Sequence, residues 1–194
     1  MKKLFLIAFS LGIFGLISCT QETTPKPTPP LKAVIDSNIN ATYSHYQFYS
    51  FEKGDTVPFS DSTTLNWDMA FNGTKIIFNS GTSGSGTAGV IIKNALFSEV
   101  LEAPTTGYVQ DGATYAIPSG SNNGWYNYAG PPNHTITPLA GKVFVVKTSK
   151  GKYAKFEILS YYLGNPAIPN GLLDISKYYT IRFVYQPDGS TNLK

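Results

Sequence analysis

The sequence has few of the residues from which catalytic and metal sites are usually built. Its 194 residues include one cysteine and two histidines, and only 14% of them are charged. The acidic residues are scattered, and the sequence contains neither the Gly-x-Ser-x-Gly turn of hydrolases nor the Gly-Lys-Ser/Thr of a phosphate-binding loop. We therefore expect that this protein is not an enzyme.

The chain also has no large excess of either positive or negative charge. The formal net charge is +3, and once Lys2 and Lys3 are set aside, 13 basic residues face 12 acidic ones. Domains that bind nucleic acid carry a clear excess of basic residues, so we expect no nucleic-acid partner. The single cysteine leaves no pair for a disulfide, so the stability of the fold has to come from its core.

That cysteine stands at the end of a targeting segment. Two lysines precede an apolar stretch that is too short to span a bilayer, and Leu-Ile-Ser-Cys follows at residues 16–19. This ending resembles a bacterial lipobox. The resemblance implies that a signal peptide, 1–18, is removed and that Cys19 becomes the first residue of a lipoprotein, acylated with palmitate-like chains. An ordinary secretory signal and an uncleaved anchor are the alternatives.

The residues after Cys19 predict a spacer. Residues 20–32 are rich in Pro and Thr and have no apolar periodicity, so 19–32 should form a lipidated, extended linker. Several acyl chains on one terminus attach a protein to a membrane durably. We expect a protein of the cell envelope, anchored to the outer membrane through its lipid alone, on either the periplasmic or the surface face.

The remaining residues, 33–194, predict one all-β, mainly antiparallel domain. The chain has 14% aromatic residues, 18 Gly and 13 Pro, with no long stretch at helical spacing. Trp67, Met69 and Phe71 alternate with polar or small residues, which indicates a strand, and Asn72-Gly73 is typical of a hairpin turn. A second strand should follow at 74–78. The glycine-rich segment 79–89 then indicates tight backbone packing.

Other elements are predicted from shorter patterns. We expect strands at 43–51, 142–148, 152–162 and 178–186, with short strands around Tyr108 and at 114–117. The segment 55–64 is expected to be a polar loop. Residues 95–101 fit either a strand or one helical turn, and 172–176 fit a short helical connector.

The order of these blocks resembles the HmuY family of haem-binding lipoproteins of Bacteroides-type bacteria. The two most specific matching blocks are W-D-M-A-F at 67–71 and N-S-G-T-S-G-S-G-T-A-G-V at 79–90. Before them the chain has S-F-E-K-G at 50–54. After them it has T-T-G-Y at 105–108, G-K-V-F-V-V-K at 141–147 and G-K-Y-A-K at 151–155. The resemblance implies a hand-shaped β protein that holds haem between loops through two axial side chains. It also implies delivery to an outer-membrane haem receptor, and hence a role in iron acquisition.

The family's axial ligands do not carry over to this sequence. In the two-histidine pattern, one ligand lies five residues after a Trp, and from Trp125 this position is Gly130. The segment 109–124, where the other ligand would lie, contains neither His nor Met. The haem-ligand candidates that remain are His134, Tyr126 and Tyr128, because imidazole and phenolate both bind haem iron.

Met69 and His45 are expected to have structural roles. Met69 lies on the apolar face of its strand and is expected in the core, and His45 is expected on a strand as a cross-strand polar residue.

The aromatic residues around Trp125 also support a second hypothesis. Trp125, Tyr126 and Tyr128, beside Pro131 and Pro132, could stack on a sugar ring or on a peptide. The protein would then be a surface ligand-binding module for a glycan or a peptide that keeps the fold without ligating haem. The same residues could instead close the end of the domain.

Overall fold

The computed structural model describes residues 30–194. The predicted signal peptide 1–18, Cys19 and residues 20–29 of the predicted linker lie outside this range. The described part contains no helix with the length and hydropathy needed to cross a membrane. Its secondary structure is almost entirely β, with two short 3-10 helices, η1 (Phe59–Asp61) and η2 (Phe97–Glu99).

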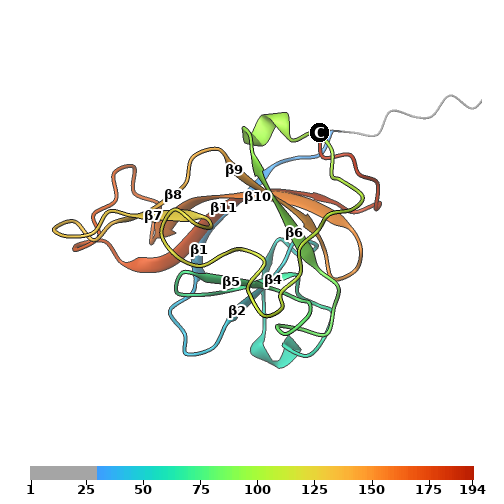
Figure 1. Cartoon of the computed structure of the whole chain (residues 1–194), viewed down its shortest axis with the longest axis horizontal. Helices are drawn as coiled ribbons and strands as arrows, with labels where there is room; N and C mark the ends of the chain where they lie inside the picture. The colour runs from blue at the N-terminus through green and yellow to red at the C-terminus, as the bar shows by residue number, and fades with distance from the viewer. Residues whose placement is uncertain (1–29) are drawn as a thin grey trace, which may run out of the picture.

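A five-stranded antiparallel sheet forms one layer of the fold (Figure 1). Its strand order is β1-β11-β10-β9-β6. The bounds are β1 (Val34–Asn40), β6 (Gly89–Asn94), β9 (Lys142–Lys147), β10 (Tyr153–Tyr162) and β11 (Ser176–Gln186). The last three strands form the predicted meander. All four residues 143–146 are buried, which confirms that this sheet is covered on both faces.

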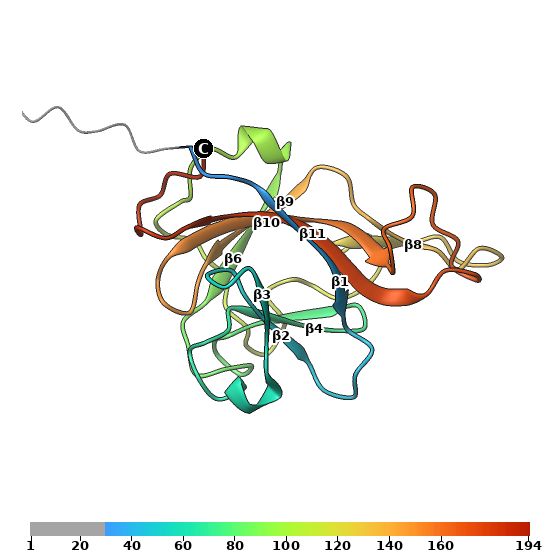
Figure 2. The ribbon, with the colours of Figure 1, turned by 180° about the vertical axis from the view of Figure 1, so that it is seen from behind.

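A four-stranded sheet of order β3-β2-β4-β5 lies below the first in Figures 1 and 2. Its strands are β2 (Gln47–Ser50), β3 (Asp55–Val57), β4 (Met69–Asn72) and β5 (Lys75–Phe78). The predicted hairpin is β4–β5, with Met69 opposite Phe78 and Asn72 opposite Lys75. The turn is therefore Gly73-Thr74, one residue later than the predicted Asn72-Gly73, and Gly73 has φ +53°.

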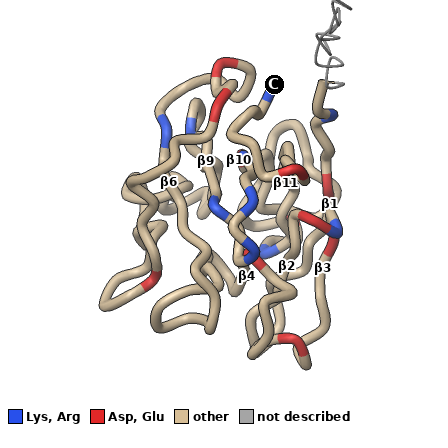
Figure 3. The backbone as a smooth tube through the Cα atoms, turned by 90° about the vertical axis from the view of Figure 1, so that its right-hand side faces the viewer, with Lys and Arg blue, Asp and Glu red and all other residues tan. Residues whose placement is uncertain are grey.

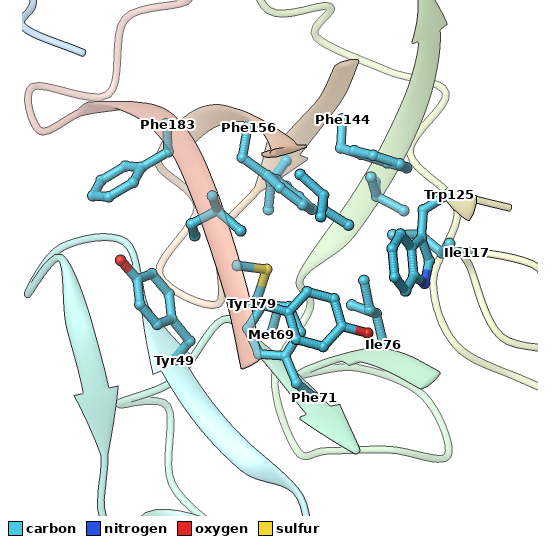
Figure 4. Close-up of a cluster of buried hydrophobic side chains, with 14 of the residues drawn as sticks. Tyr49, Met69, Phe71, Ile76, Ile117, Trp125, Phe144, Phe156, Tyr179 and Phe183 are labelled. Carbon is cyan, nitrogen blue, oxygen red and sulfur yellow. The ribbon is translucent and has the colours of Figure 1, made fainter. Parts of the chain in front are cut away.

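The main core lies between the two sheets (Figure 4). Tyr49, Met69 and Phe71 point up from the smaller sheet towards Phe156 and Phe183 of the larger one. Met69 is fully buried, which confirms its predicted role in the core. Burying large aromatic and aliphatic side chains contributes about 1.5–3 kcal/mol each, so this layer holds the domain together without a disulfide.

The outer face of the larger sheet is covered by the segment that contains η2. Phe97, Val100 and Ala103 pack against Val143 and Val145 in a second core cluster. The buried Lys155 amine donates to the carbonyl oxygens of Phe97 (3.0 Å) and Val100 (2.7 Å), which ties this segment to β10. Because η2 lies within residues 95–101, the helical-turn alternative for this segment is the correct one.

A third, two-stranded sheet extends from one end of the domain. It consists of β7 (Tyr126–Tyr128) and β8 (Ile136–Pro138), with Tyr126 opposite Pro138 and Tyr128 opposite Ile136. The Tyr162 hydroxyl accepts a hydrogen bond from the Ile136 amide (2.9 Å), which fixes this hairpin to the end of β10. In both ribbon views the hairpin lies beside the β10–β11 loop, residues 163–175, away from the stacked sheets (Figures 1 and 2).

Several predicted elements are wrong in type or extent. The early strand begins at Gln47, and 43–46 form a bend. Residues 55–64 contain β3 and η1. No strand forms at 108 or at 114–117 in the described chain, because the carboxylate of Asp111 and a single bridge to Val90 take up the backbone groups there. Residues 172–175 form a turn rather than a helix, and Ser176 already belongs to β11.

Candidate functional site

The Trp67 to Val90 block builds the fold rather than a ligand site. The Asn79 side chain is completely buried and donates to the carbonyl oxygens of Thr64 and Trp67, both at 2.9 Å. Its own carbonyl oxygen accepts from the Gly86 amide (3.0 Å). A Cβ on Gly84 would lie 2.2 Å from this oxygen, and one on Gly81 would lie 1.7 Å from the Asp111 carbonyl oxygen. The predicted tight packing of the glycine-rich segment is confirmed.

Asp68 in the same block connects the two sheets. Its carboxylate accepts from the amides of Phe51 (2.9 Å) and Ser149 (3.0 Å) and from the Ser149 hydroxyl (3.0 Å). Burial raises the pKa of Asp68 above its ordinary value, although the three donors oppose this shift. A carboxylate so fully engaged with backbone is a structural group, so the chemistry has to be sought elsewhere.

Trp125 closes the end of the main core. Its indole is 2% exposed, and its Nε1 donates to the carbonyl oxygen of Thr74 (2.9 Å). Tyr126, which is half-buried, packs its ring against this indole, with centroids 4.8 Å apart. The Trp125 indole therefore offers no face for a sugar or peptide, and that part of the second hypothesis is wrong. The competing interpretation, that these aromatics seal the domain, is confirmed for Trp125.

The structure brings two of the three haem-ligand candidates into contact. The Tyr128 hydroxyl lies 2.5 Å from Nδ1 of His134, and both side chains are exposed at the tip of the β7–β8 hairpin. The hairpin creates this contact because Tyr128 ends β7 and the Ala129 amide bonds to the Thr135 carbonyl oxygen (2.9 Å), so the chain returns beside itself. The φ of His134 is +51°, a conformation that few non-glycine residues adopt and that often marks functional sites.

The Tyr128–His134 pair can present either of two strong donors to a metal. If Nδ1–H donates to the phenolic oxygen, the lone pair of Nε2 is left for a metal, as in most metal-ligating histidines. If the hydroxyl donates to Nδ1 instead, the phenolic oxygen gains anionic character and can itself bind iron. The third candidate, Tyr126, makes no contact with this pair among the hydrogen bonds of the described residues and packs into the core instead.

The β10–β11 loop places aliphatic side chains at the same end. Gly171 lies against the hairpin tip, since a Cβ there would be 2.3 Å from the His134 carbonyl oxygen. Around it, four large aliphatic residues are exposed by 58% or more of their surface: Ile168, Leu172, Leu173 and Ile175. The Asn170 side chain accepts from the amides of Leu172 (2.9 Å) and Leu173 (3.2 Å), so a defined turn holds these leucines outward.

Sequence reasoning missed this aliphatic surface. A monomeric soluble protein rarely exposes several large aliphatic side chains together, so such a patch usually marks a binding site. The sequence did contain a signal of this exposed surface. Leu-Leu-Asp-Ile at 172–175 follows a Pro-Asn-Gly turn, and there is no neighbouring segment of alternating apolar and polar residues that would pair with it. The sequence instead predicted a short helical connector at 172–176.

The remaining histidine lies far from the hairpin tip. His45 stands in the bend before β2, between the rings of Tyr43 and Phe59, so its predicted position on a strand is wrong. Within residues 30–194, no three His, Cys, Asp or Glu side chains gather as a metal site.

The sequence matches the family model named HmuY protein over residues 42–184. The chain belongs to the HmuY family. The match covers the smaller sheet, the β7–β8 hairpin and the larger sheet except β1 and the last residues of β11. A comparison with curated proteins gave no match.

Solved structures share the HmuY-type fold at low sequence identity. A Bacteroides vulgatus protein assigned as HmuY-like and haem-binding is 19% identical, with a TM-score of 0.52 over 79% of this chain and 91% of that one. The apo HmuY analogue of Tannerella forsythia is 15% identical, with a TM-score of 0.53 over 82% of this chain and 100% of that one. These likenesses establish the shared fold.

The loop at the hairpin tip brings Gly130 and His134 together. Gly130, where the sequence resemblance implies a ligand, has φ +71° and no side chain. His134 lies on the same loop, and the Gly130 carbonyl oxygen accepts from the His134 amide (2.8 Å). The hairpin tip thus holds the imidazole of His134 four residues after the position expected for a ligand.

Proposed function

We propose that this chain is a non-enzymatic lipoprotein of the cell envelope that binds haem, or a related tetrapyrrole, for iron and haem acquisition. The observation that carries the proposal is the contact between Tyr128 and His134 beside exposed aliphatic side chains of the β10–β11 loop. Membership of the HmuY family supports the same ligand class. The acylated Cys19, the outer-membrane location and transfer to an outer-membrane receptor are parts of this proposal.

The residues at the hairpin tip fit the chemistry of haem. Haem needs a nitrogen or oxygen donor for its iron and apolar side chains against the porphyrin. The Tyr128–His134 pair would supply the axial donor, and Leu172, Leu173 and Ile168 would cover part of the ring. Tyr128 itself is 41% exposed, so its oxygen is accessible to a ligand.

A haemin titration tests the proposal. The purified protein should give a sharp Soret band that is shifted from that of free haemin and saturates at one equivalent. Tyr128→Phe and His134→Ala should each weaken binding at least about tenfold or change the ligand bands, because each removes one half of the pair. Tyr126→Phe is the matched control on the same hairpin and should leave the spectrum unchanged.

Two outcomes of this titration would contradict the proposal. One is a broad, unshifted band for the wild-type protein. This result would favour the alternative function, a surface ligand-binding module that keeps the fold without ligating haem. The other is a shifted band that survives in a Tyr128→Phe/His134→Ala double variant, which would place the iron elsewhere.

A further inference from the structure

A hollow lined by aromatic residues lies at the outer edge of the smaller sheet, apart from the hairpin tip. It has a volume of about 500 Å³ and lies between the bend at 43–46 and the segment 56–59. In Figure 1, the nearby 3-10 helix η1 is at the bottom of the molecule, whereas the β7–β8 hairpin is at the left. The hollow and the proposed haem site are therefore separate regions.

Three aromatic rings pack in a row in this hollow. The rings of Tyr43 and His45 are stacked, parallel within 6° and with centroids 5.1 Å apart, and the Phe59 ring lies 4.7 Å from that of His45 at an angle of 41°. Tyr43 is 46% exposed and Phe59 is 57% exposed. Two large aromatic side chains thus present open surface at the ends of a packed row.

The backbone beneath the row is held in place. The Asn72 amide, at the end of β4, donates to the carbonyl oxygens of Tyr43 (3.2 Å) and His45 (3.1 Å). His45 Nδ1 donates to the Tyr46 carbonyl oxygen (2.9 Å). Since this backbone and the His45 ring are held before any ligand arrives, less conformational entropy would be lost on binding.

A polar hollow of about 220 Å³ adjoins the aromatic one and shares Tyr43, Gln47 and Thr56 with it. Its other lining residues carry acceptors and amides, chiefly Asp36, Asp55, Asn38 and Asn40. In Figure 3, acidic positions lie close together where β1 and β3 meet. The two hollows together combine flat apolar rings with a dense set of hydrogen-bonding groups.

From this combination we infer that the surface formed by Tyr43, His45, Phe59, Gln47, Asp36 and Asp55 is a binding site for a neutral oligosaccharide. A sugar ring has an apolar face of C–H groups, which packs on an aromatic ring, and a rim of hydroxyls. Carboxylates accept from hydroxyl donors, and the Asn and Gln amides both donate and accept. The two carboxylates disfavour an anionic ligand, including the propionates of haem.

A chain of sugars fits the surface better than a single ring. Tyr46 lines both the aromatic hollow and a third one of about 350 Å³, and Tyr115 lines the third and a fourth of about 430 Å³. These hollows follow one another over the outer face of the smaller sheet, where Phe48 and Ile77 lie. Tyr46 and Tyr115, both half-buried, thus line successive hollows, a spacing that suits successive sugar rings.

The two carboxylates are suited to hydroxyl donors rather than to a fixed cation. Burial raises the pKa of Asp36 above its ordinary value, and the nearby Asp55 raises it further. The amides of Asn38, Asn40 and Gln47 and the Thr56 hydroxyl outnumber the two carboxylates in the polar lining. An amine ligand is the competing occupant, and the test below includes it.

NMR titration with defined sugars tests the inference. The probes are six neutral hexasaccharides: maltohexaose, cellohexaose, laminarihexaose, xylohexaose, mannohexaose and chitohexaose, each at about 5 mM, which exceeds a millimolar Kd. At least one should shift the amide signals of Tyr43, His45, Gln47 and Phe59. Tyr43→Ala and Phe59→Ala should each weaken that binding at least about tenfold. Leu96→Ala, at a residue 60% exposed outside these hollows, is the control and should bind normally.

The same titration contains the results that would overturn the inference. These are no shift with any of the six sugars, shifts outside the hollows, or a stronger response of these residues to tetramethylammonium, which would assign the surface to amines. Repeating the titration with haemin bound keeps the two sites distinguishable, because the sugar affinity should not change. Thermal unfolding of each variant shows that loss of binding does not come from loss of the fold.

Discussion

Raising the pH above 10 should unfold this protein within a few pH units, with the tyrosinate absorbance of its buried tyrosines appearing in the same step as the loss of near-ultraviolet circular dichroism. Burial raises the pKa of Tyr49, Tyr161 and Tyr179 above the ordinary value of about 10. All three side chains are at most 3% exposed. Their phenols therefore keep their protons in the folded state at a pH where the unfolded chain loses them.

The sign of this effect follows from proton linkage. Above pH 10 the unfolded state binds fewer protons than the folded state, so the free energy of unfolding falls as the pH rises, and the contribution of these tyrosines is fully present only below pH 10. Three such groups change it by about 4 kcal/mol per pH unit, which exhausts a typical stability of about 5–15 kcal/mol within a few pH units.

One buried amine opposes this trend. Burial, and next the charge of Arg182, lowers the pKa of Lys155, so this group alone would increase the stability as the pH approaches its ordinary pKa. It can release only one proton, so the tyrosines should dominate. If the tyrosinate absorbance reached the value for all 13 tyrosines while the circular dichroism stayed unchanged, these three phenols would be accessible in the folded state.

Asp68→Ala should lower the free energy of unfolding by about 4 kcal/mol or more, because a buried donor left without an acceptor costs about 1–3 kcal/mol. The backbone amides of Phe51 and Ser149 lose their acceptor at once, whereas the Ser149 hydroxyl can still donate to the Leu65 carbonyl oxygen (2.9 Å). Asp68→Asn keeps one acceptor oxygen and should cost less. Urea unfolding followed by circular dichroism gives both values.

The neighbouring ion pair provides the control for Asp68. Glu52 pairs with Lys150 at 2.5 Å, but both side chains are about half exposed. Glu52→Ala should therefore change the stability by about 1 kcal/mol or less. Equal losses for Asp68→Ala and Glu52→Ala would mean that the Asp68 carboxylate does not connect the two sheets.

The sequence predicted the parts of the fold that depend on local patterns. The β4–β5 hairpin, the β9–β11 meander and the packed glycine-rich segment all follow from side-chain alternation, turn residues and small residues within one short stretch. By contrast, β1 was missed because Ile39 is its only buried residue, so the strand has no apolar face to recognise. The strand assigned to 114–117 failed because the Asp111 side chain accepts from the Ala116 amide, which no local pattern reveals.

The candidate site was predicted in part. His134 and Tyr128 were identified as ligand candidates, but their contact depends on hairpin register and on the left-handed conformation of His134. The role of Trp125 stayed open because an aromatic residue beside prolines looks the same in sequence whether it is buried or exposed. The hollow around Tyr43 was not predicted, because residues 43–46 were expected to be part of a strand. Phe59, which also lines it, belongs to the segment 55–64 that was expected to be a polar loop.

Amide hydrogen exchange with and without haemin tests the central claim most directly, because it shows where the ligand binds. Haem held at the hairpin tip should slow exchange in residues 126–138 and 163–175 and leave residues 43–59 unchanged. A Soret shift accompanied by protection at 43–59, or by no protection in the hairpin and the β10–β11 loop, would contradict the account.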